Sequence, residues 1–262
     1  MKFGRFEEQG RSFYGLVEGD QVTELEGSPF ASYKQTPKRH ALSALKTLLP
    51  CNPANFYCAG LNYAAHIEWA NSRKGSNMKL PQKADIGYRS ANALIATGEN
   101  IVIPADSPGP VQFEGELVAV IGRTARHLSE QEALSCVLGY TLGNDLSERT
   151  WQGQDRTLWR AKNSDTFKPM GPFITTGLDP MKLTVGIRVN GKTATEYDTG
   201  KMLFSCQHYI AQITKYMTLH PGDVLWLGTD NATEPDLKEG DLVEIYQKDI
   251  GVLSNRVTRA KA

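Results

Sequence analysis

The chain has 262 residues, and its 29 basic side chains balance its 29 acidic ones. This even balance excludes the strongly basic surface that nucleic acids and anionic membranes attract. No apolar run approaches the roughly 18 residues that a membrane helix needs, and residues 1–9 lack the apolar core of a signal peptide. We therefore expect a cytoplasmic protein with no nucleic-acid or membrane partner.

The amino-terminal part predicts a small β domain. Short strand-like runs alternate with turns over residues 1–23, which is typical of antiparallel strands. Residues 41–50 have the composition of a brief amphipathic helix that ends at Pro50. We place the boundary just after it, with a small N-terminal domain over residues 1–52 and a larger domain over residues 53–262. The fold class we expect is α+β, mostly β.

The larger domain opens with a strand that leads into a helix. Residues 55–63 begin as the strand, and residues 64–70 have helical composition. His66 and Glu68 lie two residues apart there, and side chains at i and i+2 of a helix do not face each other. The next segment, residues 71–84, is polar and without apolar periodicity, which predicts a loop. This loop is either a lid over a substrate or a variable surface excursion.

Residues 111–122 predict a strand with two carboxylates on one face. Glu114 and Glu116 project together, because side chains alternate along a strand. Apolar residues follow on both faces, which predicts burial, and two buried anions repel each other unless a cation lies between them. The alternative is the solvated face of an edge strand, where an isolated Glu-x-Glu is more common.

A third carboxylate follows the next predicted strand. Residues 141–144 indicate a strand end and residues 146–152 a helix start, with Asp145 between them as an acidic cap. Asp145, Arg149 and Gln152 would then share one helical face, because they are spaced at i, i+4 and i+7. Three carboxylates without His or Cys are hard oxygen ligands, which suit Mg²⁺, Mn²⁺ or Ca²⁺ better than a structural Zn²⁺. An isolated Asp before a helix is otherwise more often a simple cap.

The remaining segments predict two helices and several strands. Ser129 and the acids behind it begin a helix, and residues 206–217 form an amphipathic helix. Residues 184–192 predict a hairpin with an Asn-Gly turn. A later strand ends at Gly228 and Thr229, where backbone N–H groups and a hydroxyl can hold a carboxylate. The sequence contains no nucleophile elbow and no dinucleotide-binding glycine pattern.

Several separated motifs resemble the fumarylacetoacetate hydrolase family, in that family's order, from about Tyr57 to Val257. These motifs are Phe113–Gly122, Gly139–Gln152, Ala161–Phe167 with Gly171 and Pro172, and Pro221–Thr229. The resemblance implies a mixed β-roll catalytic domain behind a small N-terminal domain, and commonly a homodimer. It also implies a site spread over several segments: the metal ligands Glu114, Glu116 and Asp145, the active-site lysine Lys162, and the substrate-pocket residues Arg149, Gln152, Gly228 and Thr229.

The chain departs from the family pattern around the substrate pocket. The family's general-base dyad is a His followed three residues later by a Glu, whereas Glu68 follows His66 after two; both stay candidates for catalysis. Arg89 stands where a Lys is usual, and it either binds a substrate carboxylate or forms a structural ion pair. Asp230 replaces a Pro at the proposed carboxylate site. Ala59 replaces a fourth metal-binding residue of longer members, so we expect three protein carboxylates at the metal.

The resemblance implies divalent-metal-dependent hydrolysis of a carbon–carbon bond in an acylpyruvate-type 2,4-dioxo acid, as in aromatic-compound catabolism, with Mg²⁺ or Mn²⁺ as cofactor. The alternative is a metal-dependent decarboxylase or isomerase of 2-oxo or 2-hydroxy-dienoic acids. The displaced Glu68 favours this alternative, because such a reaction needs no water-activating dyad. A third hypothesis is a protein that keeps the fold without catalysis, against which the intact Glu114, Glu116, Asp145 and Lys162 argue.

Overall fold

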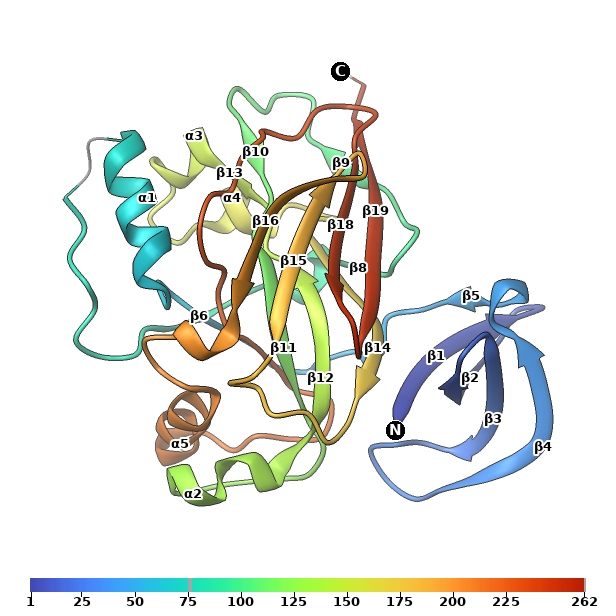
Figure 1. The fold of residues 1–262 in the computed structure, drawn as a ribbon. Helices are drawn as coiled ribbons and strands as arrows, with labels where there is room; N and C mark the ends of the chain where they lie inside the picture. The colour runs from blue at the N-terminus through green and yellow to red at the C-terminus, as the bar shows by residue number, and fades with distance from the viewer. Residues whose placement is uncertain (75–76, 262) are drawn as a thin grey trace.

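The computed structural model describes residues 1–74 and 77–261 and is built mostly from strands (Figure 1). A long sheet of twelve strands runs through the molecule, and a five-stranded sheet packs against one face of its central part. The predicted α+β, mostly β fold is confirmed.

The long sheet contains, in spatial order, β4 (Tyr33–Ala41), β3 (Gln21–Gly27), β2 (Arg11–Glu18), β1 (Lys2–Glu8), β14 (Lys168–Thr175), β12 (Val137–Asn144), β11 (Gly115–Ile121), β17 (Val224–Trp226), β6 (Phe56–Ala59) and β7 (Ile86–Tyr88); β5 (Lys46–Thr47) pairs with β1, and β8 (Leu94–Ile95) with β14. The second sheet contains, in order, β16 (Lys192–Asp198), β15 (Thr184–Val189), β18 (Leu242–Gln247), β19 (Gly251–Arg259) and β9 (Ile101–Ile103). A separate pair is formed by β10 (Val111–Gln112) and β13 (Ser147–Glu148).

The first four strands form the small antiparallel unit drawn in blue in Figure 1. This unit is joined to the rest of the molecule by main-chain pairing, because β1 lies antiparallel to β14 with Phe3 opposite Ile174. The amino-terminal strands therefore extend the main sheet instead of closing a sheet of their own.

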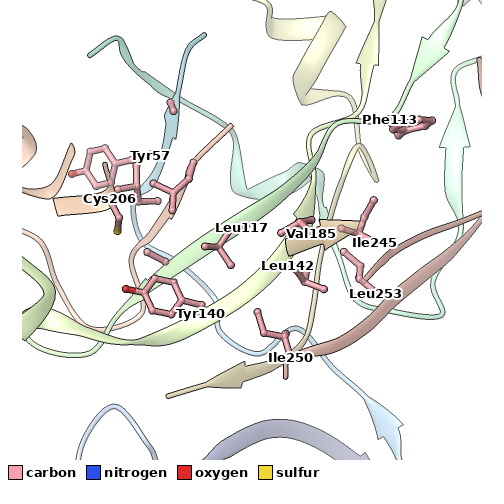
Figure 2. Close-up of a cluster of buried hydrophobic side chains, with 14 of the residues drawn as sticks. Tyr57, Phe113, Leu117, Tyr140, Leu142, Val185, Cys206, Ile245, Ile250 and Leu253 are labelled. Carbon is pink, nitrogen blue, oxygen red and sulfur yellow. The ribbon is translucent and has the colours of Figure 1, made fainter. Parts of the chain in front are cut away.

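The main core lies between the two sheets (Figure 2). Leu117 of β11 and Leu142 of β12 project from the long sheet, and they meet Val185, Ile245 and Leu253 of the second sheet. These residues alternate with neighbours that point the other way, as the period of a strand requires. All five side chains are buried.

The opposite face of β11 is buried as well, which rules out the solvated edge strand that the sequence left open. Val118 and Val120 pack there with Trp226 and with Phe3 of the N-terminal unit. Gly143 on the neighbouring strand makes room for the indole, since a Cβ at this position would lie 2.6 Å from the ring of Trp226. The central strand is thus enclosed on both faces.

The helices gather in two groups at the edges of the sheets (Figure 1). They are α1 (Ala64–Lys74), α2 (Glu130–Ala133), α3 (Arg149–Gln152), α4 (Trp159–Asn163) and α5 (Cys206–Tyr216), and the 3₁₀ turns are η1 (Leu42–Ala44), η2 (Ala91–Ala93), η3 (Leu134–Cys136) and η4 (Thr199–Lys201). The predicted helices at α1, α2 and α5 and the predicted Asn-Gly hairpin between β15 and β16 are confirmed. Within the described ranges, no helix is long and apolar enough to cross a membrane.

Two local predictions are wrong. The expected helix at residues 41–50 is the short turn η1 followed by strand β5, because Thr47 pairs with Phe6 of β1 and Leu45 packs into a small core beside it. The expected loop at residues 71–84 begins too early, since α1 continues to Lys74. Residues 75 and 76 of that segment lie outside the described residues.

Candidate active site

Strand pairing brings three carboxylates together at one end of β11. Glu116 lies on β11 opposite Gly143 of β12, and Glu114 precedes the strand. The N–H of Asp145 donates to the carbonyl of Glu114 at 2.8 Å, so the end of β12 holds Asp145 beside it. All three carboxylates are buried, and their candidate ligand atoms lie within 4.8 Å of one another.

Three cations surround Asp145. The guanidinium of Arg89 reaches it in a bidentate pair, with Nε 3.0 Å from Oδ1 and Nη2 2.9 Å from Oδ2. The ammonium groups of Lys162 and Lys168 lie 2.7 and 2.8 Å from its two oxygens. Burial alone would raise the pKa of Asp145, but Arg89, Lys162 and Lys168 outweigh it and hold this pKa well below its usual value. Asp145 is therefore ionised.

Glu114 is held by two further ion pairs. Its carboxylate lies 2.6 Å from the ammonium of Lys162 and 2.8 Å from the guanidinium of Arg149. Burial opposes ionisation, yet these two cations lower the pKa of Glu114 to about 2. Lys162 thus bridges Glu114 and Asp145 through one ammonium group.

Glu116 differs from the other two carboxylates. In the described part of the chain it makes no ion pair, and its hydrogen-bond partner is the backbone N–H of Gly228 at 2.7 Å. Burial and the nearby charges of Asp145 and Glu114 raise the pKa of Glu116 to about 8. A buried carboxylate without a cation, beside two others that are ionised, is the arrangement that a divalent cation completes. The residues present fit a hard metal ion.

Arg149 and Gln152 reach the site from α3, although not in the way the sequence suggested. The helix begins only at Arg149, and its N-cap is Glu148, whose side chain accepts the N–H of Trp151. Asp145 is therefore neither a cap nor part of a helical face, because β13 intervenes and keeps the backbone extended. The guanidinium of Arg149 still reaches Gln152, at 2.7 Å from its amide oxygen.

The other predicted pocket residues also lie at the site. Of the two roles left open for Arg89, the structure has the ion pair, with Asp145. Gly228 has a φ of +88°, a conformation that glycine adopts without strain, and this turns its N–H toward Glu116. Thr229 follows it and is buried.

These side chains line one cavity of about 330 Å³, within the range of small-molecule sites. The polar wall combines ten of the predicted residues: His66, Arg89, Glu114, Glu116, Asp145, Arg149, Gln152, Lys162, Gly228 and Thr229. Trp69, Met78 and Leu158 supply an apolar part. A larger and more open groove borders the site through Arg89 but contains none of the three carboxylates, so the chemistry belongs to the smaller cavity.

The structure does not bring Glu68 into this cavity. Its side chain is exposed on α1, and within the described residues no polar contact joins it to His66. The Nδ1 atom of His66 instead lies 2.8 Å from the carbonyl oxygen of Asn231. The imidazole also stacks on Trp69, with 5.7 Å between the ring centroids.

Sequence reasoning missed several residues that support the site. Lys168 is fully buried and donates to the carbonyls of Leu146 and Phe167 besides its pair with Asp145. Burial, together with the nearby cations, lowers its pKa to about 8, although Asp145 opposes this. Gln112 accepts from Arg149 at 2.7 Å. Lys168 directly follows the motif that ends at Phe167, but the sequence held no signal for its role, because a lysine is almost never fully buried unless it is paired.

Comparisons with known proteins agree with this geometry. Residues 55–258 match the family model described as fumarylacetoacetate (FAA) hydrolase C-terminal, and residues 1–50 match one described as Rv2993c-like, N-terminal. The mitochondrial oxaloacetate tautomerase Fahd2a of Rattus norvegicus is 31% identical over 84% of this chain and 74% of its own length.

Two solved structures show the same fold over nearly the whole chain. The 5-carboxymethyl-2-hydroxymuconate delta-isomerase from Mycobacterium smegmatis has a TM-score of 0.89 and 33% identity, covering 99% of this chain and all of its own. A fumarylacetoacetate hydrolase from Exiguobacterium antarcticum has a TM-score of 0.83 and 28% identity, with the same coverage. These similar proteins are thus named for isomerisation, tautomerisation and hydrolysis.

Proposed function

Because the chain belongs to the fumarylacetoacetate hydrolase family, we propose that Glu114, Glu116 and Asp145 hold a divalent metal, Mg²⁺ or Mn²⁺, and that the site acts on a small 2-oxo acid. Glu116 carries the proposal, as a buried carboxylate that meets one backbone N–H and no cation within the described residues. Oxygen ligands of this kind serve both ions.

The enolate of the substrate is the species that such a site would stabilise. When bound, the divalent ion would polarise the 2-oxo group and lower the energy of the enolate formed as an adjacent bond breaks. Lys162 and Arg149 hold positive charge at the inner wall, where they offset developing negative charge without reorganising. The N–H of Gly228 already donates to Glu116, and the hydroxyl of Thr229, at the same wall, can orient a carboxylate of the substrate.

The reaction we propose first is hydrolysis of an acylpyruvate-type 2,4-dioxo acid. His66 would take a proton from water, the hydroxide would add to the 4-carbonyl, and the bond between C3 and C4 would break. The products are a carboxylic acid and pyruvate. A cavity of about 330 Å³ with an apolar side at Trp69 suits a small substrate with an acyl group.

A second candidate is isomerisation, tautomerisation or decarboxylation of a related oxo acid. The exposed position of Glu68 favours it, because His66 then has no carboxylate partner to strengthen it as a base for water. Relatives named as an oxaloacetate tautomerase and a muconate isomerase point the same way. Both candidates require the same enolate.

The deciding experiment follows acetylpyruvate, fumarylpyruvate and oxaloacetate by NMR with metal-stripped protein, before and after Mg²⁺ or Mn²⁺ is added. Metal-dependent release of pyruvate and a second carboxylic acid supports the hydrolase. Pyruvate and CO₂ from oxaloacetate, or faster keto–enol exchange alone, supports the second candidate. Absence of any metal-dependent change, together with no metal binding, would mean a protein that keeps the fold without catalysis.

We also propose a homodimer. The measurement is the mass in solution by light scattering, for which a dimer gives twice the 28.9 kDa of one chain.

A further inference from the structure

His66 lacks the carboxylate that usually orients a catalytic imidazole, yet its ring is held in place. It lies in the first turn of α1, and its Nδ1 atom is 2.8 Å from the carbonyl oxygen of Asn231. A carbonyl only accepts hydrogen bonds, so Nδ1 must carry the proton. In a neutral imidazole this leaves Nε2 bare and able to accept a proton. The position of the Asn231 carbonyl therefore decides which nitrogen of His66 can act as a base.

One buried side chain fixes the position of this carbonyl. Asp230 is 1% exposed, and its Oδ1 accepts two backbone N–H groups, from His66 at 3.1 Å and from Asn231 at 2.8 Å. A single carboxylate oxygen thus ties the first turn of α1 to the backbone N–H of Asn231, the residue whose carbonyl faces the imidazole. Its negative charge also lies at the amino terminus of an 11-residue helix, where it is favourable.

The backbone at the next residue is equally specific. Asn231 has a φ of +60°, a left-handed conformation that Asn tolerates and β-branched residues do not. Its side chain donates to the carbonyl of Glu196 at 3.0 Å, away from His66. The imidazole therefore contacts the backbone carbonyl of Asn231 and not its side chain. The conformation of the turn sets the position of this carbonyl.

We propose that Asp230 is the positioning residue for His66 and does the orienting work that the sequence suggested for Glu68. It acts through the backbone, by holding the Asn231 carbonyl against Nδ1. Asp230 is not among the residues that line the cavity in the described structure. This inference rests on the proposed role of His66 as a base, but the tautomer of the ring can be measured without any turnover.

Two matched pairs of variants test the proposal. Asp230→Ala removes both acceptor contacts, whereas Asp230→Asn keeps an amide oxygen that can accept both N–H groups. Asn231→Val disfavours the positive φ, whereas Asn231→Gly allows it, and both lose the same side-chain bond to Glu196. The ring nitrogens of His66 are observed in ¹H–¹⁵N spectra at a pH where the imidazole is neutral, and His66→Gln assigns the signals.

We expect the Nδ1-protonated tautomer in the wild type, in Asp230→Asn and in Asn231→Gly, and a mixture of tautomers in Asp230→Ala and Asn231→Val. With the metal-loaded protein, kcat of Asp230→Ala should be about 100-fold below that of Asp230→Asn, with little change in KM, because a misplaced base affects the chemical step. A merely structural role would lower the melting temperature without changing the tautomer.

The proposal is overturned if Asp230→Ala keeps the Nδ1-protonated tautomer, or if Asp230→Ala and Asp230→Asn turn over equally. If Asp230→Ala does not fold, the same spectrum of Asn231→Val and Asn231→Gly tests the proposal, and it is overturned if both variants keep the Nδ1-protonated tautomer. If His66→Gln leaves turnover unchanged, the proposed role of His66 as a base fails, and the tautomer result still shows independently whether Asp230 orients the ring.

Discussion

Glu116 is the candidate metal ligand whose charge has no counter-ion among the described residues. We expect Glu116→Gln to weaken Mn²⁺ binding by about 100-fold or more, because loss of even an outer partner of a ligand costs 10- to 100-fold. Because its pKa is raised to about 8, Glu116 without metal must take up a proton near neutral pH when the chain folds, and the change to Gln removes this cost. The metal-free protein should therefore become more stable by about 1–3 kcal/mol. Calorimetric Mn²⁺ titration and urea unfolding measure the two effects.

The matched control for this change is Glu239→Gln, which removes one negative charge from an exposed position. It should leave both Mn²⁺ affinity and stability within experimental error of the wild type. Unchanged Mn²⁺ affinity in Glu116→Gln would contradict the assignment of this carboxylate as a ligand.

Lys168 is a residue whose importance was invisible in the sequence. Its ammonium is fully buried and serves Asp145 and two backbone carbonyls. Lys168→Met keeps the length of the side chain but leaves these acceptors without their donor. We expect a loss of about 3–5 kcal/mol in the free energy of unfolding, measured in urea. Lys182→Met, at an exposed lysine paired on the surface, should change it by less than about 1 kcal/mol; equal effects of the two variants would count against this reading.

The site residues that could be predicted from the sequence are those that lie in local motifs. The three carboxylates, Lys162 and Arg149 lie in motifs whose order and spacing carry the resemblance, and the structure places all five at one cavity. The partnership of Asp230 with His66 spans 164 positions. A periodic pattern of residues cannot reveal a contact between such distant positions. From the sequence, Asp230 is therefore only a residue that replaces a Pro at the proposed carboxylate site.

At the scale of elements, the strands and the longer helices were predictable, and the short elements were not. α5 shows an apolar face along 11 residues, which gives a clear helical period. α3 has only four residues, which is too short for a helical period of apolar residues. The sequence therefore predicts its N-cap at Asp145, whereas the N-cap is Glu148. At residues 41–50, pairing of β5 with β1 prevails over a weak helical composition.

The N-terminal strands contain an ion pair with a defined pH dependence. Arg11 holds Glu24 in a bidentate pair, with distances of 2.9 and 2.7 Å, and His40 lies 3.2 Å from the same carboxylate. The hydrogen bonds from Arg11, followed by that from His40, overcome burial and lower the pKa of Glu24 from 4.5 to about 2. A carboxylate with a lowered pKa stabilises the fold above its unfolded pKa and loses this contribution as the pH falls.

We therefore expect Glu24→Gln to reduce the free energy of unfolding at pH 6 by about 1–2 kcal/mol, a discounted value because half of the Arg11 side chain is exposed. The difference from the wild type should shrink as the pH falls from about 5 toward 2. Urea unfolding at pH 6, 4 and 3 measures this. Glu26→Gln, at an exposed position two residues along the same strand, is the control and should show little effect at any pH; a constant difference for Glu24→Gln would contradict the assigned ion pair.

For the whole molecule, the continuous sheet joins the N-terminal unit to the larger domain through main-chain pairing of β1 with β14. Phe3 pairs opposite Ile174 and packs in one buried cluster with Val118, Val120 and Trp226. The sequence indicated where the composition changes, near residue 52, but composition cannot show that β1 continues the sheet through β14. This pairing predicts that both parts unfold in a single transition.

The tryptophans make that prediction testable, because all four lie in the larger domain, at positions 69, 151, 159 and 226. Phe3→Ala should cost about 3–5 kcal/mol, and the loss should appear in full in tryptophan-detected urea unfolding. Far-UV circular dichroism, which reports both parts, should give the same midpoint. Tyr216→Ala, at a side chain that is 75% exposed, is the control and should leave the midpoint unchanged. Two separated transitions, with the tryptophan signal unaffected by Phe3→Ala, would mean that the shared sheet does not couple the N-terminal strands to the larger domain.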